Sequence, residues 1–254
     1  MAWKLDIPHI KGSLINLINS IGCCDLCGGD LNQVHQSIPT LKQSLVCHNC
    51  INDLPYFDQE LISANLLNWP AVSKALPGIY FDQLFALAPY IYPFEHWLAQ
   101  LKYSGRFEVA GLLSVLLSTQ WQTTQMHKAN IDLVLSVPLH IKKWQLRGYN
   151  QAHLIAENFA QELTIPYDEN LLVRSKNNES QMGKTGAQRR KNLLNNFVLH
   201  HKLPSNIKHV LLVDDVVTTG TTASEISKLL KRAGVETVTL VTVCLTLPTK
   251  KPNS

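Results

Sequence analysis

The sequence has no long apolar run and little excess charge of either sign. None of its 254 residues belong to an uninterrupted apolar stretch of about 18 residues, the length of a membrane-spanning helix. The formal net charge of +4 is too small to indicate nucleic-acid binding by itself. Asp6, Pro8, His9 and Lys11 interrupt the apolar core that an N-terminal secretion signal would need. We therefore expect a cytoplasmic protein.

Glycine is scarce, with 12 residues, and a complete glycine-rich nucleotide loop is missing. Gly183 begins a Gly-Lys-Thr tripeptide, but the first glycine of a P-loop would fall on Asn178, which excludes that motif. No internal repeat is visible. Apolar residues nevertheless make up 45% of the chain, so the sequence predicts a sizeable core rather than wholesale disorder.

Cysteine is also rare, but most of the six cysteines lie close together. Cys24 and Cys27 form one Cys-x2-Cys pair, Cys47 and Cys50 form a second, and 19 residues separate the pairs. Each such turn points two sulfurs at one ion, and two turns complete a tetrahedron around zinc. Since four thiolates leave no open position, this spacing predicts a structural zinc ribbon rather than a catalytic metal.

The cysteine pattern leaves alternatives open. Buried reduced thiols or a redox pair would also be compatible with a cytoplasmic protein. Cys23 lies next to Cys24 and is an alternative ligand, whereas we do not expect His48, inside the second pair, to bind metal. Cys244 lies in an apolar run and is interpreted as an inert core residue.

The remainder of the chain alternates between strand and helix patterns. A proline-marked connector places a domain boundary near residue 75, which gives an N-terminal module over 1–75 and a larger domain over 76–254. Alternation of this kind predicts an α/β domain with a parallel sheet covered by helices on both faces. We expect strands within 131–139, 171–175, 209–213 and 235–246, and helices over 150–163 and 222–234.

The most informative stretch is VLLVDDVVTTGTT, from Val210 to Thr222. It places Asp214 and Asp215 at the end of a buried strand, where parallel sheets bind ligands. The loop that follows leads into a helix, whose amides and positive end attract a phosphate. Carboxylates beside a phosphate site suit sugar hydroxyls or Mg²⁺, so the sequence predicts a phosphorylated sugar as ligand.

This stretch resembles the PRPP-binding signature of type I phosphoribosyltransferases, where PRPP is the 5-phosphorylated ribose diphosphate. The resemblance implies that the loop binds the 5-phosphate and that Asp214 and Asp215 bind the ribose hydroxyls, with a catalytic role for the pair. Mg²⁺ would accompany the diphosphate. The implied phosphate-loop residues are Thr218, Thr219, Gly220, Thr221 and Thr222.

Two further segments agree with this resemblance. Residues 136–160 contain a basic turn, which looks like the pyrophosphate loop, with Lys142, Lys143, Arg147 and Gly148. Residues 174–197 look like the flexible loop that closes over PRPP. Its charged and polar candidates are Gln181, Lys184, Arg189 and Arg190. A hood over residues 80–130 would select the acceptor, which the sequence does not identify.

Together with the cysteine pairs, these motifs resemble the ComF family over nearly all of the chain from Cys24 to Thr246. The further motifs that carry this resemblance are CDLCGG, CHNC, LKYSG, VPLHIKKWQLRGYNQA and QMGKTGAQRRKNLLNNF. The resemblance implies a zinc module fused to a phosphoribosyltransferase-like domain, and a role in DNA uptake during natural transformation. It also implies single-stranded DNA as partner, with a competence helicase as a possible further partner.

Two hypotheses for the activity follow. In the first, the protein is a Mg²⁺-dependent phosphoribosyltransferase of nucleotide or related metabolism with an unknown acceptor, independent of DNA. In the second, it is a non-catalytic adaptor that binds PRPP or nucleic-acid phosphate. Trp144 and Tyr149 would then stack on bases of a single strand, unless they are core aromatics. The basic face would comprise Lys142, Lys143, Arg147, Lys184, Arg189, Arg190 and Lys191.

Two weaker hypotheses concern other segments. The stretch between the cysteine pairs contains Lys42 and little other positive charge, which favours packing or partner docking over direct DNA contact. Lys102 and Tyr103 belong to the LKYSG mark, and Lys102 would supply one more positive charge beside the phosphates if it is not merely solvated.

Overall fold

The computed structural model describes residues 22–31, 45–174 and 196–246, apart from the side chains of His127 and Lys128. The chain divides into two compact units, Met1–Leu54 and Pro55–Ser254. Segment 55–75 belongs to the second unit, because Leu66 and Val72 lie in its hydrophobic core. The boundary expected near residue 75 therefore falls inside that unit.

The first unit is built around the two cysteine pairs. A turn at residues 25–27 is closed by the Cys24 amide, which donates to the Gly29 carbonyl, and by the Gly28 amide, which donates to the Cys24 carbonyl. The second pair lies at helix α2 (His48–Asn52). Asp25 donates its amide to the Leu45 carbonyl, which joins the two segments. Hydrogen bonds of the backbone thus bring together cysteines that are far apart in the sequence.

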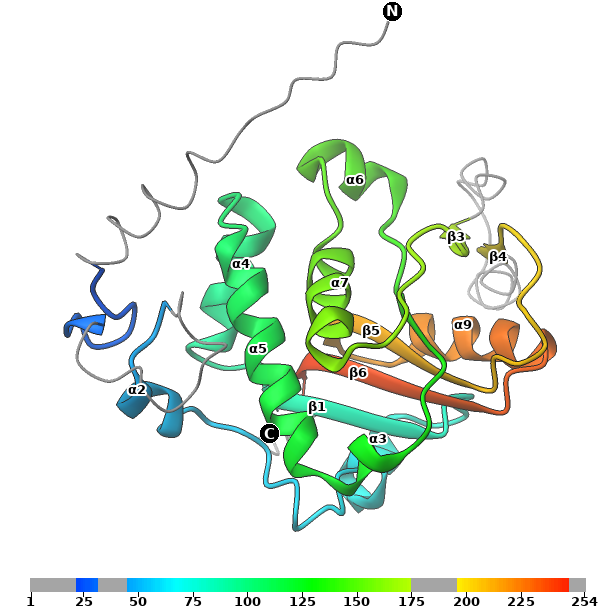
Figure 1. The fold of residues 1–254 in the computed structure, drawn as a ribbon, viewed down its shortest axis with the longest axis horizontal. Coiled ribbons are helices and arrows are strands. Elements are labelled where there is room, and N and C mark those ends of the chain that lie inside the picture. Colours follow the sequence, from blue (N-terminus) through cyan, green and yellow to red (C-terminus); the bar gives the residue numbers. More distant parts are fainter. Residues whose placement is uncertain (1–21, 32–44, 175–195, 247–254) are drawn as a thin grey trace, which may run out of the picture. The chain divides into compact units, whose positions relative to one another are not determined.

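The second unit contains a four-stranded parallel sheet, with strand order β1-β6-β5-β2 (Figure 1). The strands are apolar and branched, as is typical of a sheet buried on both faces. They span β1 (Gln83–Pro89), β2 (Leu133–Ser136), β5 (His209–Val217) and β6 (Thr237–Leu245). The parallel α/β fold predicted from the sequence is confirmed.

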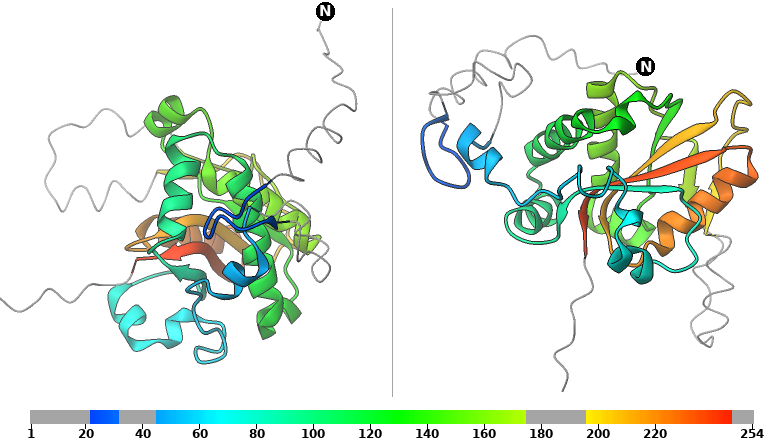
Figure 2. Two further views of the ribbon diagram at one scale, coloured as in Figure 1. Left: turned by 90° about the vertical axis from the view of Figure 1, so that its left-hand side faces the viewer. Right: turned by 90° about the horizontal axis from the view of Figure 1, so that it is seen from below.

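Helices cover both faces of this sheet (Figure 2). On one face, α5 (Glu108–Thr123) packs against α7 (Gln151–Leu163), and the Trp121 ring meets Phe85 of β1 and Phe159 of α7 edge to face. On the other face, Ile226 and Leu230 of α9 (Thr221–Arg232) enter the core together with residues from 62–81. That second segment includes η3 (Leu66–Asn68) and α3 (Pro70–Ala75).

The remaining elements connect or flank these layers. They are α4 (Phe94–Tyr103), η4 (Gln125–Lys128), α6 (Ile141–Arg147), β3 (Leu172–Arg174) and β4 (Phe197–Leu199). Strands β3 and β4 form a separate antiparallel pair, so the strand predicted at 171–175 does not join the parallel sheet. The basic turn expected around Lys142 is the short helix α6, which ends at Gly148 in the left-handed region at φ 78°.

Gly220 allows the chain to pass from β5 into α9. It precedes the helix at φ 65°, a backbone conformation that a residue with a Cβ adopts at a cost. A Cβ at this position would lie 3.4 Å from both Leu76 Cδ2 and Phe81 Cζ. The absence of a side chain at Gly220 therefore permits both the turn into α9 and the close approach of Leu76 and Phe81.

We predict that Gly220→Ala lowers the free energy of unfolding by about 1–2 kcal/mol, because the new side chain enters the left-handed region in a tightly packed place. Urea denaturation followed by circular dichroism measures this. Gly111→Ala is the matched control, since it lies within α5 with no atom within 4 Å of the added Cβ. That variant should gain about 0.5–1 kcal/mol. Equal stability of the Gly220 variant and the wild type would contradict the prediction.

Candidate functional site

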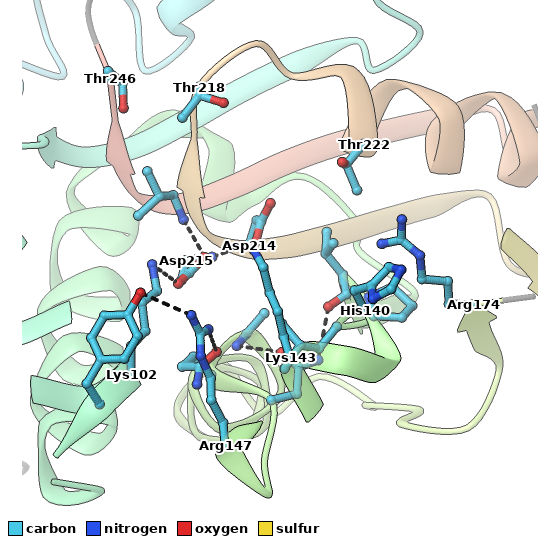
Figure 3. Close-up of a pocket in the computed structure, with 18 of the residues that line it drawn as sticks. Lys102, His140, Lys143, Arg147, Arg174, Asp214, Asp215, Thr218, Thr222 and Thr246 are labelled. Atoms are coloured by element: carbon cyan, nitrogen blue, oxygen red, sulfur yellow. Dashed lines mark hydrogen bonds and ion pairs between the residues drawn. The ribbon is translucent and has the colours of Figure 1, made fainter. Parts of the chain in front are cut away.

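A pocket of about 500 Å³ lies at the carboxyl ends of the parallel strands (Figure 3). The residue that follows each of the four strands lines it: Tyr90 after β1, Val137 after β2, Thr218 after β5 and Thr246 after β6. Parallel sheets bind ligands at this edge because the loops there are free to vary over a rigid frame. The fold therefore marks this pocket as the candidate site.

The acid pair and two threonines come from β5 and the start of α9. Asp214 and Asp215 lie within β5, which continues for two more residues beyond them, so they do not end the strand as the sequence suggested. Thr218 and Thr222 are exposed and line the same pocket. Figure 3 shows the two carboxylates between these threonines and the side chains of α6.

Asp214 is held in an unfavourable electrostatic environment. Burial raises its pKa well above the ordinary value, and the negative charge of Asp215 raises it further. The Asp215 amide donates to Asp214 Oδ1 at 2.9 Å, and Lys102 also favours the charged form, but these effects do not reverse the shift. A cation beside Asp214 would oppose this rise, because it would favour the carboxylate.

Asp215 is paired with a lysine from a distant segment. Lys102 Nζ, at the end of α4, lies 2.5 Å from Asp215 Oδ2, and both side chains are mostly buried. The Val216 amide donates to the other oxygen, Asp215 Oδ1, at 2.9 Å. Lys102 therefore fixes the orientation of Asp215 and balances part of the negative charge of the pair.

The opposite wall is basic and is formed by α6 and the start of α7. Lys143 and Arg147 line the pocket together with Asn150 and Gln151. Asn150 caps α7 by accepting from the Ala152 amide, and its side-chain amide donates to the Val137 carbonyl, which ties the helix to the end of β2. The N-terminus of α7 thus faces the pocket and adds to its positive potential.

Two buried donors in this wall have no hydrogen-bond partner. Gln151 is 1% exposed; its Oε1 accepts from Arg147 at 2.9 Å, and its Nε2 is without an acceptor. Arg147 Nε is likewise unpaired, although its terminal nitrogens bond to Gln151 and to the Tyr103 hydroxyl. Unpaired buried donors are costly, so a wall that retains them is suited to a ligand rich in acceptor oxygens.

The structure thus brings together many of the residues that the sequence singled out. The pocket is lined by Asp214, Asp215, Thr218, Thr222, Lys143, Arg147, Lys102 and Tyr103. Other candidates do not line it, namely Thr219, Gly220, Thr221, Lys142 and Gly148. Of these, Gly220 is buried against Leu76 and Phe81, and Thr219 and Thr221 share a hydrogen bond between their hydroxyls at 2.9 Å. Gln181, Lys184, Arg189, Arg190 and Lys191 lie outside the described residues.

Sequence reasoning missed several residues of the pocket. Arg174, at the end of β3, and His140, which caps α6 by accepting from the Lys142 amide, both line it. Gln151 and Thr246 are further examples. Each of these residues lies at the end of a strand or at the start of a helix. Element boundaries predicted from a sequence are only approximate, so the sequence alone did not indicate these positions.

The four paired cysteines converge in the first unit. The sulfur atoms of Cys24, Cys27, Cys47 and Cys50 all lie within 4.8 Å of one another, and those of Cys27 and Cys47 are 3.8 Å apart. A tetrahedral zinc site with Zn–S bonds of about 2.3 Å has sulfur–sulfur edges of about 3.8 Å. Cys23 lies outside this set and pairs through its backbone with Asp30. The geometry fits one metal ion held by four thiolates.

The first cysteine is also poised electrostatically for metal binding. Burial raises the pKa of Cys24, but amide donors, first that of Cys47 and then those of Cys27 and Leu26, outweigh it and bring the pKa to about 6. A thiolate is the form that binds metal. Burial and the neighbouring sulfurs raise the pKa of Cys50, so a cation is needed to balance a set of four thiolates.

The fold and the pocket at the strand ends identify the class of protein. The chain has a type I phosphoribosyltransferase fold, joined to a four-cysteine module that can hold a metal such as zinc. The family model described as a phosphoribosyl transferase domain matches residues 150–254.

Comparison with curated relatives identifies the family within this class of protein. Competence protein F of Haemophilus influenzae is 33% identical over 91% of this chain and 92% of its own. The DNA utilization protein YhgH of Escherichia coli K12 is 31% identical over 89% of this chain and 98% of its own. The chain therefore belongs to the competence protein F family.

Among solved structures, adenine phosphoribosyltransferase from Leishmania tarentolae is similar to 56% of this chain and 73% of its own, at 18% identity and a TM-score of 0.34. In the part of the chain that the structure describes, none of the helices has the length and apolar character to cross a membrane.

The raised pKa of Asp214 predicts that the acid opposes folding at neutral pH. Because the folded pKa lies above the unfolded one, the carboxyl costs stability as pH rises from about 4 through the folded pKa. We predict that Asp214→Asn raises Tm, by about 2–4 °C for each kcal/mol relieved, and that the gain grows from pH 4 to pH 7.5. Scanning calorimetry at several pH values measures it.

Asp132 offers a control of opposite sign. Amides of His209 and Lys208 lower its pKa, so its charged form stabilises the fold above the ordinary carboxyl pKa. Asp132→Asn should lower Tm at neutral pH and have a smaller effect as the solution becomes acidic. A lower Tm for Asp214→Asn at every pH would show that its carboxylate is stabilising, contrary to the prediction.

Proposed function

We propose that the pocket at the carboxyl edge of the sheet binds PRPP together with Mg²⁺. The observation that carries this proposal is the meeting of two carboxylates, three threonines and four basic side chains in one pocket of about 500 Å³. Acidic groups alone would repel a phosphate, and basic groups alone would not select a sugar. A ligand with ring hydroxyls between two phosphate groups fits both sets.

Each end of the ligand has a matching wall. Thr218 and Thr222, with the start of α9, would hold the 5-phosphate through hydroxyl and amide donors. Lys143 and Arg147, with the start of α7, would hold the diphosphate. The carboxylate of Asp215, oriented by Lys102, and that of Asp214 lie between these walls and would accept hydrogen bonds from the ribose hydroxyls.

The acid pair also fits Mg²⁺. Carboxylate oxygens are its preferred protein ligands, usually one or two together with phosphates and water. Asp214 and Asp215 are the candidates to hold it, and the ion would neutralise charge on the diphosphate. A cation here would also relieve the unfavourable burial of the Asp214 charge.

We further propose that this binding serves the uptake or use of DNA in the cytoplasm, with single-stranded DNA as a partner and a competence helicase as a possible further one. The names of the relatives, competence protein F and DNA utilization protein, support this. Helix α6 supports it too, since Lys142, Lys143 and Trp144 are all exposed on it and Trp144 is 52% exposed. Such a combination of charge and an aromatic ring is typical of single-strand binding.

We also propose that the cysteine cluster holds a structural zinc ion. The first unit is small, and the described part of it buries few apolar side chains, so metal binding would supply part of its folding free energy.

The PRPP proposal predicts that replacing both acids with amides abolishes high-affinity binding. Asp214→Asn with Asp215→Asn should weaken PRPP binding in the presence of Mg²⁺ by at least about 100-fold, because each hydrogen bond to a carboxylate contributes about 1.5–3 kcal/mol. Isothermal titration calorimetry measures it. Glu162→Gln, exposed near the far end of α7, is the control and should bind PRPP normally.

Unchanged PRPP affinity in the double variant would refute the proposal. A pyrophosphate-release assay with candidate acceptors then separates the two kinds of activity. Release that depends on an acceptor identifies a phosphoribosyltransferase, and binding without turnover identifies an adaptor.

The zinc proposal predicts a difference between neighbouring cysteines. Cys24→Ser should lose zinc on dialysis against a chelator, because it removes one of the four converging sulfurs. Cys23→Ser should retain it, since Cys23 lies outside the cluster. Elemental analysis by mass spectrometry measures the zinc content. Equal zinc loss from both variants, or zinc-free wild-type protein purified without chelator, would contradict the proposal.

A further inference from the structure

Lys102 lies on the acid pair at the place where the proposed function puts Mg²⁺. Its Nζ is 2.5 Å from Asp215 Oδ2, and the two side chains are only 16% and 17% exposed (Figure 3). The other carboxylate oxygen, Oδ1, accepts from the Val216 amide at 2.9 Å. Both oxygens of Asp215 are therefore engaged, Oδ1 by the backbone and Oδ2 by an ammonium group.

Two other basic side chains of the same pocket are directed to different partners. Arg147 bonds to Gln151 and lies over the Tyr103 ring. Arg174 lies over the Phe197 ring at 5.2 Å. Among the described lining residues, Lys102 is thus the basic residue paired with an acid, although it comes from α4, outside the residues 150–254 that match the phosphoribosyl transferase model.

The backbone on either side of Lys102 is fixed, whereas its side chain is long and rotatable. The carbonyl of Leu101 accepts from the Tyr149 hydroxyl, and the hydroxyl of Tyr103 accepts from Arg147 at 3.3 Å. These contacts hold the end of α4 against the end of α6. A lysine has a flexible four-carbon stem and three rotatable donors. The ammonium group can therefore leave the acid pair by side-chain rotation, without movement of α4.

We propose that Lys102 is the built-in cation of the acid pair, and that it prevents Mg²⁺ from binding there until a phosphorylated ligand brings the metal with it. This rests on the proposed function, because that ligand is taken to be PRPP. Free Mg²⁺ would have to displace or approach an ammonium group of the same sign on Asp215. Like charges a few ångströms apart repel strongly in a partly buried site, and Mg²⁺ gives up its water reluctantly.

The phosphorylated ligand removes this obstacle in two ways. Its diphosphate adds negative charge, which lowers the electrostatic cost of a second cation in the pocket. Its phosphate oxygens also offer the ammonium group a charge-assisted hydrogen bond in place of the one to Asp215. Metal and ligand should consequently bind cooperatively, and each should raise the affinity of the other by the same factor.

The first measurement uses the full-length protein as purified, without PRPP. Mn²⁺, which prefers the same oxygen ligands as Mg²⁺, is titrated, and electron paramagnetic resonance follows its free form. We expect Lys102→Met to bind one Mn²⁺ ion at least about tenfold more tightly than the wild type, because loss of the ammonium group frees Asp215 Oδ2. Lys102→Gln is a second uncharged variant and should show the same gain, which keeps the test valid if Lys102→Met fails to fold.

Three further variants make the result specific. Lys102→Arg keeps the charge and should bind Mn²⁺ as weakly as the wild type. Lys143→Met removes a positive charge from the same pocket but keeps the pair of Lys102 with Asp215, so it should gain less than about threefold. Lys102→Met combined with Asp215→Asn should lose the gained affinity, which assigns the ion to the acid pair.

The second measurement repeats the Mn²⁺ titration with PRPP present, corrected for the Mn²⁺ that PRPP binds in solution. The wild type should then bind Mn²⁺ tightly, whereas Lys102→Met should gain less from PRPP. The ratio of Mn²⁺ affinities with and without PRPP should therefore be about tenfold smaller in the variant. A lysine that only orients Asp215 would leave this ratio unchanged.

The outcomes separate this inference from the proposed function. It is overturned if neither uncharged variant gains Mn²⁺ affinity, if Lys143→Met gains as much as Lys102→Met, or if the wild type binds Mn²⁺ tightly without PRPP. Because these results need no PRPP, a wild type that still binds PRPP with Mg²⁺ would leave the proposed function standing. A gained Mn²⁺ site in a protein that binds no PRPP would refute the proposed function and retain the block of free metal by Lys102.

Discussion

Parallel pairing of β5 with β6 and β2 is the constraint on which the site depends. The register places Asp214 opposite Thr242 of β6, and it places Val213 opposite Ser136 at the end of β2. All four strands consequently end on the same edge, where Tyr90, Val137, Thr218 and Thr246 line the pocket. Because successive side chains of a strand point to opposite faces, a shift of β5 by one residue would exchange the faces of Asp214 and Asp215 and separate Asp215 from Lys102.

The acid pair carries an electrostatic cost that the rest of the pocket offsets only in part. Burial and the neighbouring charge raise the pKa of Asp214, while Lys102 from α4 compensates part of the cost through Asp215. Residues that function requires are often kept in such unfavourable surroundings. The unpaired buried donors of Gln151 and Arg147 on the facing wall are also unfavourable, and a bound oxyanion would satisfy them.

The second unit contains two cavities that share Lys102, Tyr103 and Arg147 as lining residues, the candidate site of about 500 Å³ and a second cleft of about 630 Å³. The first is lined by carboxylates, threonines and basic side chains, whereas the second is lined by Phe107, Leu146 and Tyr149 in addition to the shared residues. Arg147 belongs to both, because it bonds to Gln151 on one side and stacks on Tyr103 on the other.

Local sequence determined the cysteine pairs, the order of most strands and helices, and the acid pair followed by a threonine-rich loop, because each depends on spacing or periodicity within a short window. Tertiary structure decided which residues meet. Lys102 reaches Asp215 across more than 100 positions in the sequence, Gly220 faces Leu76 and Phe81 rather than the pocket, and β3 pairs with β4 outside the main sheet. It also excluded Cys23 from the cysteine cluster and directed the Tyr149 hydroxyl to the Leu101 carbonyl. These outcomes depend on long-range packing and on the direction of each side chain, which a linear pattern does not specify.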